Sequence, residues 1–286
     1  MLLTFALLGA AMLALWISVR WLWAVLGLAA LAAALAAGIV QPIGLAGITL
    51  WFGLLMGWKQ ADRSGARPVS RGLMAIVLLA VAAALMLHRI PGFMNPRVID
   101  TVRFTPDAIP FTLYLNFDKT LIGLGLFALI LPRLSTGCEW RQVLKSTGLR
   151  ALGVMGAVLA ASLAAGYVRW APKFPDETWR WAGVNLLFVC TAEEALFRGF
   201  IQGGLRRALS ARRGGHWLAL AVAALAFGLA HLAGGWAYVA LATLAGAGYG
   251  WIYESTRRVE ASVLAHFGLN AVHFLLFTYP ALAVAG

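Results

Sequence analysis

Six polar side chains lie within or beside long apolar stretches in the second half of this sequence. They are Glu193, Glu194, Arg198, His231, His266 and Asn270. A charged side chain near the centre of a bilayer costs about 2.5–3.5 kcal/mol on insertion scales, so such a group is a candidate for function. A carboxylate can take a proton from water, and imidazole and amide groups can donate hydrogen bonds to a developing negative charge. Together these residue types contain the parts needed for hydrolysis.

The two neighbouring acids cannot have the same role if they lie on one helix. Adjacent helical residues point in different directions, whereas residues four apart share a face. Glu194 and Arg198 are four apart and are expected to form an ion pair that relieves the cost of burial. Glu193 is then left to face the interior of a helix bundle as a candidate base. The structural alternative is that all three charges only hold helices together.

Two later apolar runs supply the remaining polar groups. His266 and Asn270 are four residues apart, so both project from one helix face. His231 lies near the end of a separate run, and a straight helix would place it too deep by about 10 Å relative to Glu193. Either the span boundaries differ from those given below, or a helix near His231 is offset, tilted or broken around a water-filled cavity. His273 shares the face of His266 and is either a partner of the site or a packing group.

The composition indicates the kind of element that must position these groups. Of 286 residues, 62% are apolar and 12% are charged, against about 45–50% and about 25% in soluble domains. The mean hydropathy is +0.82, which is typical of a chain solvated by lipid. We predict an all-α, polytopic transmembrane helical bundle with about 8–10 membrane spans. The apolar runs lie near residues 2–19, 21–40, 43–58, 72–88, 119–133, 149–168, 181–201, 216–233, 236–253 and 261–279.

The net charge of +12 does not indicate nucleic-acid binding. Lys and Arg cluster in alternate loops between the apolar runs, as the positive-inside rule predicts for cytoplasmic loops. The intervening segment 89–118 is long and contains four prolines, so it is a candidate surface or re-entrant segment. Cys138 and Cys190 have no partner spacing and are expected to be free thiols.

Three short motifs follow one another in this half of the chain. They are E-E-x-x-x-R at Glu193, Glu194 and Arg198, then F-x-x-x-H at Phe227 and His231, then H-x-x-x-N at His266 and Asn270. In this order and spacing they resemble the type II CAAX prenyl endopeptidase family, whose bacterial members are called CPBP or Abi intramembrane proteases.

The resemblance implies an intramembrane endopeptidase. Glu193 would activate the hydrolytic water, which His231 would help to hold, and His266 and Asn270 would stabilise the oxyanion. Glu194 and Arg198 would organise the site. No cofactor is expected in this glutamate mechanism. The alternative is a zinc enzyme, because a carboxylate and two imidazoles can also be ligands of catalytic zinc.

The resemblance also divides the chain and suggests its surroundings. Residues 149–286 would form the protease domain, and residues 1–148 would be N-terminal transmembrane helices of unknown role. The partners would be membrane lipid and a peptide or membrane-protein substrate. A composition rich in Ala and Arg but poor in Lys suggests a bacterial cytoplasmic (inner) membrane.

Two other classes of function compete with proteolysis. In a proton-coupled transporter, Glu193 and the histidines would form a proton relay, but paired broken helices in two matching halves are not evident in the sequence. A catalytically silent scaffold or immunity protein would be favoured by loss of a motif residue, and every motif residue is present.

Overall fold

The computed structural model describes residues 1–17, 19–65 and 67–283. Residues 18, 66 and 284–286 lie outside these ranges. The chain forms two compact units, each assembled from separated segments. Unit 1 contains residues 1–96, 115–135 and 187–196, and unit 2 contains residues 97–114, 136–186 and 197–286. The boundary predicted at residue 148 came from the resemblance and stays a prediction.

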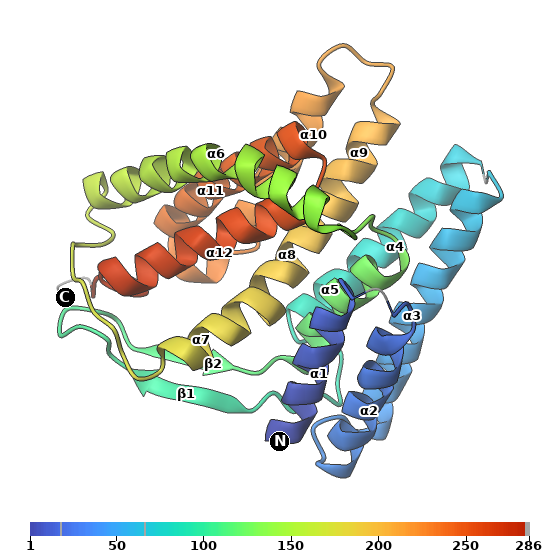
Figure 1. The fold of residues 1–286 in the computed structure, drawn as a ribbon, viewed down its shortest axis with the longest axis horizontal. Helices are drawn as coiled ribbons and strands as arrows, with labels where there is room; N and C mark the ends of the chain where they lie inside the picture. Colours follow the sequence, from blue (N-terminus) through green and yellow to red (C-terminus); the bar gives the residue numbers. More distant parts are fainter. Residues whose placement is uncertain (18, 66, 284–286) are drawn as a thin grey trace. The chain divides into compact units, whose positions relative to one another are not determined.

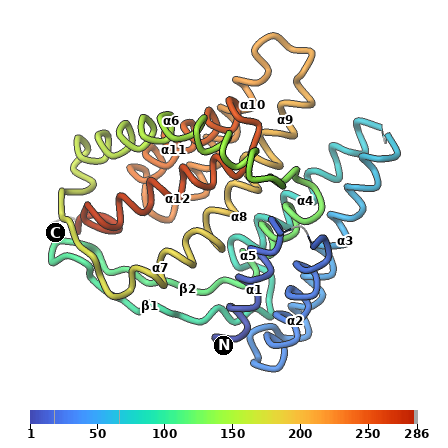
Figure 2. Tube along the Cα trace, in the orientation of Figure 1, coloured from blue at the N-terminus to red at the C-terminus, as the bar shows by residue number. Residues whose placement is uncertain are grey.

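Unit 1 consists of helices. They are α1 (Leu2–Ala14), α2 (Leu22–Ala36), α3 (Pro42–Arg63), α4 (Pro68–Met86), α5 (Phe117–Leu129) and the short α8 (Thr191–Glu194). α1 packs on α2 and α3 packs on α4, so neighbours in sequence are neighbours in space (Figure 2). Pro42 and Pro68 each begin a helix, where the missing N–H of proline costs no hydrogen bond.

The centre of unit 1 is α5, which is buried along most of its length and contacts α3, α4 and α8. Trp51 of α3 donates its Nε1–H to the carbonyl of Leu121 at 2.9 Å. A Cβ on Gly125 would lie 2.6 Å from the Leu55 side chain and 2.7 Å from Trp51 Nε1. Glycine at this position therefore allows α3 and α5 to approach closely.

Unit 2 contains the long helices α6 (Gly137–Ala164), α10 (Gly215–Leu229), α11 (Gly235–Thr256) and α12 (Val259–Leu276), with the shorter α7 (Thr178–Val184), α9 (Gly203–Ala208) and the 3₁₀ turn η3 (Leu232–Gly234). α6, α11 and α12 pack against one another (Figure 1). α6 begins at a capping box in which Thr136 and Glu139 exchange side-chain and backbone hydrogen bonds, and this arrangement satisfies amides that a helix start leaves open.

The segment 89–118 contains the strands of the structure. β1 (Arg97–Val102) and β2 (Phe111–Tyr114) form an irregular antiparallel pair. Ile99 of β1 is buried with Trp181 of α7 and Phe274 of α12. The rings of Trp181 and Phe274 stack with centroids 4.2 Å apart. This aromatic cluster joins the hairpin to the helices of unit 2, so the predicted surface segment is an ordered part of the fold.

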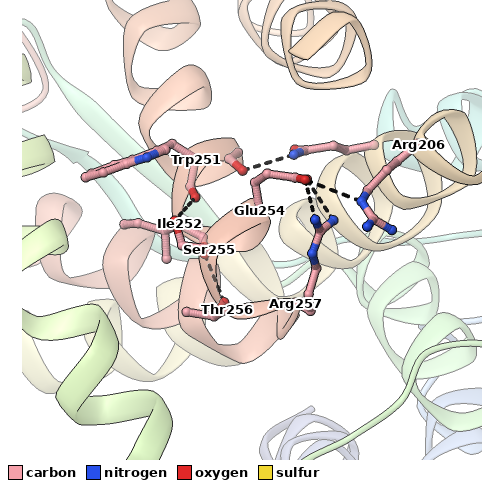
Figure 3. A network of polar contacts seen from close by, with 9 residues as sticks. Arg206, Trp251, Ile252, Glu254, Ser255, Thr256 and Arg257 are labelled. Atoms are coloured by element: carbon pink, nitrogen blue, oxygen red, sulfur yellow. Dashed lines mark hydrogen bonds and ion pairs between the residues drawn. The ribbon is translucent and has the colours of Figure 1, made fainter. Parts of the chain in front are cut away.

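A charged cluster joins α9 to the end of α11 in unit 2 (Figure 3). Glu254 accepts hydrogen bonds from Arg206 at 3.3 Å and from Arg257 at 2.9 Å. Arg257 adopts a left-handed conformation, with φ of +58°, and ends α11. The cluster fixes α9, and with it the chain that follows Arg198, against α11.

Each predicted apolar run coincides with helical structure, and the all-α membrane fold class is confirmed. Within the described ranges, α4, α6 and α12 are long and apolar enough to cross a membrane individually, and the bent pair α10 and α11 supplies a fourth candidate if counted as one span. α1 and α2 are apolar but shorter. Their 13 and 15 residues extend about 20 Å at about 1.5 Å per residue, less than the hydrocarbon thickness of about 30 Å. The figure of about 8–10 spans therefore stays a prediction.

Candidate functional site

The first motif lies in an unusual helical stretch. The chain is helical without a break from Thr178 to Ala208, but residues 185–190 (η1) and 195–202 (η2) are π-helical and flank α8. π-Helical turns are rare and frequently occur at functional sites, where they widen the helix by one residue per turn. The acidic pair therefore stands on one α-helical turn between two π segments. Within this α-helical turn, adjacent residues point in different directions, as expected for Glu193 and Glu194. Across η2 the helix has more residues per turn, so residues four apart, such as Glu194 and Arg198, no longer share a face in the α-helical way.

Glu193, Glu194, Arg198 and His266 are buried, with exposed fractions of 5%, 0%, 0% and 5%. Glu194 belongs to unit 1 and Arg198 to unit 2, so their expected ion pair stays a prediction. Charged groups are almost never fully buried without a structural or chemical purpose. Their burial is consistent with functional as well as structural roles.

Glu193 forms an ion pair that the sequence did not reveal. Lys119 Nζ of α5 donates to Glu193 Oε1 at 2.6 Å. Both side chains are largely buried, with exposed fractions of 15% for Lys119 and 7% for Glu193. The signal of this ion pair in the sequence is a single lysine at the beginning of the apolar run 119–133.

In unit 2, the ring of Phe227 is the common neighbour of three predicted site residues. The Arg198 guanidinium lies 4.7 Å from its centroid, a distance suited to a cation–π interaction. The rings of His231 and His266 lie 4.7 and 5.6 Å from it. The phenylalanine of the F-x-x-x-H motif thus brings Arg198, His231 and His266 together around one apolar surface.

His231 lies at a break between helices. α10 ends at Leu229, η3 follows His231, and the helices on either side are bent by 54°. A broken helix was one of the alternatives for His231, and the structure shows a break at this position. α10 and α11 pack closely, since a Cβ on Gly228 would lie 1.9 Å from Thr243 Oγ1.

The break also defines the hydrogen bonding of the His231 ring. Nδ1 lies 2.7 Å from the Phe227 carbonyl oxygen. A carbonyl only accepts, so Nδ1 carries the proton and donates it. In a neutral ring Nε2 then has a lone pair, available to accept from water or to bind a metal.

α12 presents His266 and Asn270, as predicted from their spacing. The His266 ring stacks on Tyr249 of α11 with centroids 4.7 Å apart, and Ser262 holds the two helices together by donating to the Tyr249 carbonyl at 2.9 Å. Asn270 Nδ2 donates to Asn185 Oδ1 at 3.2 Å. These contacts give both motif side chains fixed partners within unit 2.

Several contributors to the site were missed or assigned no role. Asn185 and Tyr249 were not identified, although a buried asparagine in an apolar run is a signal of the same kind as the motif residues. Gln202 of η2 donates to the Gly250 carbonyl at 2.9 Å, which ties the π segment to α11.

For His273 the sequence allows either a place in the site or a role in helix packing. Its Nε2 lies 3.1 Å from the Thr278 carbonyl, to which it donates. This bond caps the end of α12, so the packing alternative describes His273 better than membership of the site.

The apolar helices and the buried polar groups on them define the class of this protein. It is an integral, multi-pass, all-α membrane protein in which acidic, guanidinium, imidazole and amide groups are buried on helices. Residues 175–272 match the family described as type II CAAX prenyl endopeptidase Rce1-like. The matched segment contains all three motifs, and it confirms the resemblance inferred from them. Comparison with curated proteins and with solved structures found no match.

The family match supports protease activity of the CAAX type in a membrane. Within residues 1–17, 19–65 and 67–283, groups of three or more His, Cys, Asp or Glu side chains placed to hold a metal ion are not found. Glu193 lies in unit 1, and both imidazoles lie in unit 2. The zinc alternative therefore remains open beside the glutamate mechanism.

Proposed function

We propose that this protein is an intramembrane endopeptidase that hydrolyses a peptide bond of a membrane-embedded or membrane-proximal substrate. Glu193 is the general base, His231 holds the water, and His266 and Asn270 stabilise the oxyanion. Glu194 and Arg198 organise the site. The observation that carries the proposal is the match of residues 175–272 to the endopeptidase family, with all motif residues present in the matched segment.

The proposed reaction needs no group beyond these residues and water. Glu193 takes one proton from water while the water oxygen attacks the carbonyl carbon of the peptide. The carbonyl oxygen becomes an oxyanion that accepts hydrogen bonds from His266 and Asn270. The C–N bond then breaks, and Glu193 returns its proton to the leaving amine. The products are a new carboxyl terminus and a new amino terminus, and the base is restored.

The side-chain contacts support this division of roles. The lone pair on His231 Nε2 suits a group that holds water, because Nδ1 is committed to the Phe227 carbonyl. Asn270 uses its amide to donate to Asn185, and an amide has a second N–H that can serve an oxyanion. Stacking on Tyr249 fixes the plane of the His266 ring. Fixed donors stabilise a transition state without reorganising during the reaction.

The substrate is expected to reach the site from the membrane. We infer a peptide or membrane-protein substrate, membrane lipid as the other partner, and the cytoplasmic membrane of a bacterium as the location. The second candidate mechanism is zinc-dependent proteolysis, for which the lone pair of His231 Nε2 is the supporting observation. In that mechanism Glu193, His231 and His266 would be ligands, and zinc would supply a more acidic bound water.

Comparative terminal proteomics tests the proposed activity even though the substrate is unidentified. The purified full-length protein is incubated in detergent with a mixed extract of bacterial membrane proteins, and new peptide amino termini are labelled and identified by mass spectrometry. The wild type and Glu177→Gln, which makes the same chemical change in the segment before α7, should produce the same new termini. Glu193→Gln should produce none while remaining folded, since it keeps the shape of the side chain but removes the base. Near-normal formation of these termini by Glu193→Gln would show that Glu193 is not the base.

A further inference from the structure

The ion pair between Lys119 and Glu193 is buried in unit 1. Nζ and Oε1 are 2.6 Å apart, and each side chain is mostly inaccessible. An ammonium group and a carboxylate at this distance form a short charge-assisted hydrogen bond. Removing one partner of a buried ion pair takes the opposite charge away from a buried ion, which is generally much less favourable than removing both.

The helix that carries Lys119 is packed closely onto the turn that carries Glu193. Gly123 lies four residues after Lys119, so the two share a face of α5. A Cβ on Gly123 would lie 3.1 Å from both the Cα and the backbone nitrogen of Ala192, the residue before Glu193. The glycine therefore permits backbone contact between α5 and α8, and this contact fixes the distance that the Lys119 side chain spans.

A polar cluster holds the first turn of α5 in place. Asn95 Oδ1 accepts from the backbone N–H of Phe117 at 3.1 Å, and Asn95 Nδ2 donates to Asp118 Oδ1 at 3.1 Å. The second oxygen of Asp118 lies 2.7 Å from His88 Nδ1. Asp118 is 1% exposed. These contacts fix the backbone that precedes Lys119. The Lys119 ammonium group therefore extends to Glu193 from a fixed position on α5.

We propose that Lys119 is a positioning residue for the reaction, which holds the Glu193 carboxylate charged and in a fixed orientation for taking a proton from the hydrolytic water. This inference rests on the proposed function. One carboxylate oxygen is engaged by the ammonium group, which restricts rotation of the carboxylate. The positive charge also favours the ionised carboxylate, the form that can accept a proton.

Asp118 and Asp62, two other acids of unit 1, pair with bases other than Lys119. Asp118, the residue before Lys119, is engaged by His88 and Asn95. The helices α3 and α4 carry their charges at or near their ends, where Arg71 pairs with Asp62. Because Lys119 touches the Glu193 carboxylate directly, its removal should change the charge environment of Glu193 more than any surface substitution.

The test compares three lysine variants by the rate at which new amino termini form in the same membrane-protein extract, between pH 5 and pH 9. Lys119→Met retains the aliphatic length but removes the charge, and Lys119→Arg retains the charge. Lys145→Met is the matched control, because Lys145 is exposed on α6. At pH 7 we expect Lys119→Met to lower kcat by about 10- to 100-fold with little change in KM. The acidic limb of its rate profile should move to higher pH. Lys119→Arg should recover part of the rate, and the control should match the wild type.

These outcomes separate the two proposals. If Glu193→Gln is inactive but Lys119→Met has a normal rate and pH profile, the positioning role is refuted and the proposed function survives. If Glu193→Gln is active, both fail. A loss of rate in Lys119→Met with an unchanged pH profile would indicate a merely structural contact and would also refute the positioning role.

A double-mutant cycle on thermal stability tests the pair independently of activity and of any substrate. The melting temperatures of wild type, Lys119→Met, Glu193→Gln and the double variant are measured in the same detergent. Each single change should lower the melting temperature, and the double variant should lose less than the two losses combined, since it leaves no unmatched charge. Strictly additive losses would show that the side chains do not interact and would overturn the inference.

Discussion

Because α5 and α8 are in close contact, the position of Glu193 should depend strongly on the size of the side chain at residue 123. Ordinary contacts of a Cβ begin at 3.4 Å, whereas a Cβ on Gly123 would lie 3.1 Å from two backbone atoms of Ala192. The shortfall is 0.3 Å, and the neighbour is backbone, which cannot rotate away. Gly123→Ala therefore requires α5 and α8 to separate by a few tenths of an ångström, and Gly123→Leu requires considerably more.

The expected loss of activity follows from the small displacement of catalytic groups that an active site tolerates. Catalytic groups must be held within about 0.5 Å of the productive geometry, and a displacement of about 1 Å can lower the rate about 100-fold. We expect Gly123→Ala to lower kcat by less than about 10-fold. Gly123→Leu should lower it by about 100-fold and destabilise the fold by about 1–3 kcal/mol through overpacking.

The matched control is Gly53 on α3, where an added Cβ meets no atom within 4 Å. Gly53→Ala should leave activity unchanged and stabilise the helix by about 0.5–1 kcal/mol, since glycine loses more backbone entropy than alanine. Activity is measured as the rate of new amino-terminus formation, and stability as the melting temperature of the detergent-purified protein. The reasoning would be refuted by a Gly123→Leu protein with wild-type kcat, or by Gly53→Leu reducing kcat to the same extent.

Three further predictions concern the oxyanion donors, metal and pH. His266→Ala and Asn270→Ala should each lower kcat by about 10²–10³-fold. The double variant should lose less than the product of the two losses, because both donors stabilise the same charge. Multiplicative losses in kinetic assays would contradict this and show that the two donors act independently. The protein should remain active after metal removal, whereas stoichiometric zinc in active protein, with activity lost on stripping and regained on adding zinc, would establish the zinc mechanism. Burial lowers the pKa of Lys173, in the loop before α7, to about 8, although Asp107 acts in the opposite direction. As the pH rises, the folded state therefore loses the Lys173 proton at a lower pH than the unfolded state does. The Lys173 contribution to the free energy of unfolding should then rise between pH of about 8 and about 10.5. Melting temperatures of wild type and Lys173→Met measured across this range should diverge, and parallel curves would contradict the assignment.

The sequence predicted the features that depend on local pattern. Apolar runs indicated the helices, because lipid requires long apolar segments with internal hydrogen bonding. The spacing of His266 and Asn270 correctly placed them on one helix. The depth of His231 in its apolar run allowed wrong span boundaries or an offset, tilted or broken helix, and the structure has a break at this position.

Features that depend on contacts between distant segments could not be predicted. Lys119 and Glu193 are 74 residues apart, and no local rule joins them. The π segments on both sides of the acidic pair have no periodic signature, so the spacing of Glu194 and Arg198 was interpreted as ordinary α-helix. The hairpin of β1 and β2 is short and irregular, and its attachment depends on Trp181 and Phe274, which lie far along the chain.

The interleaving of the two units has a consequence for synthesis of the protein. Unit 1 needs residues 187–196 for completion, but the ribosome makes the whole segment 136–186 of unit 2 first. Chains grow at about 5–20 residues per second, so α5 leaves the ribosome several seconds before the turn that bears Glu193. During this interval Lys119 has been made but its carboxylate partner has not. The nascent helices of unit 1 therefore contain Lys119 without its carboxylate partner during this interval. The packing of unit 1 is completed only when residues 187–196 have been inserted.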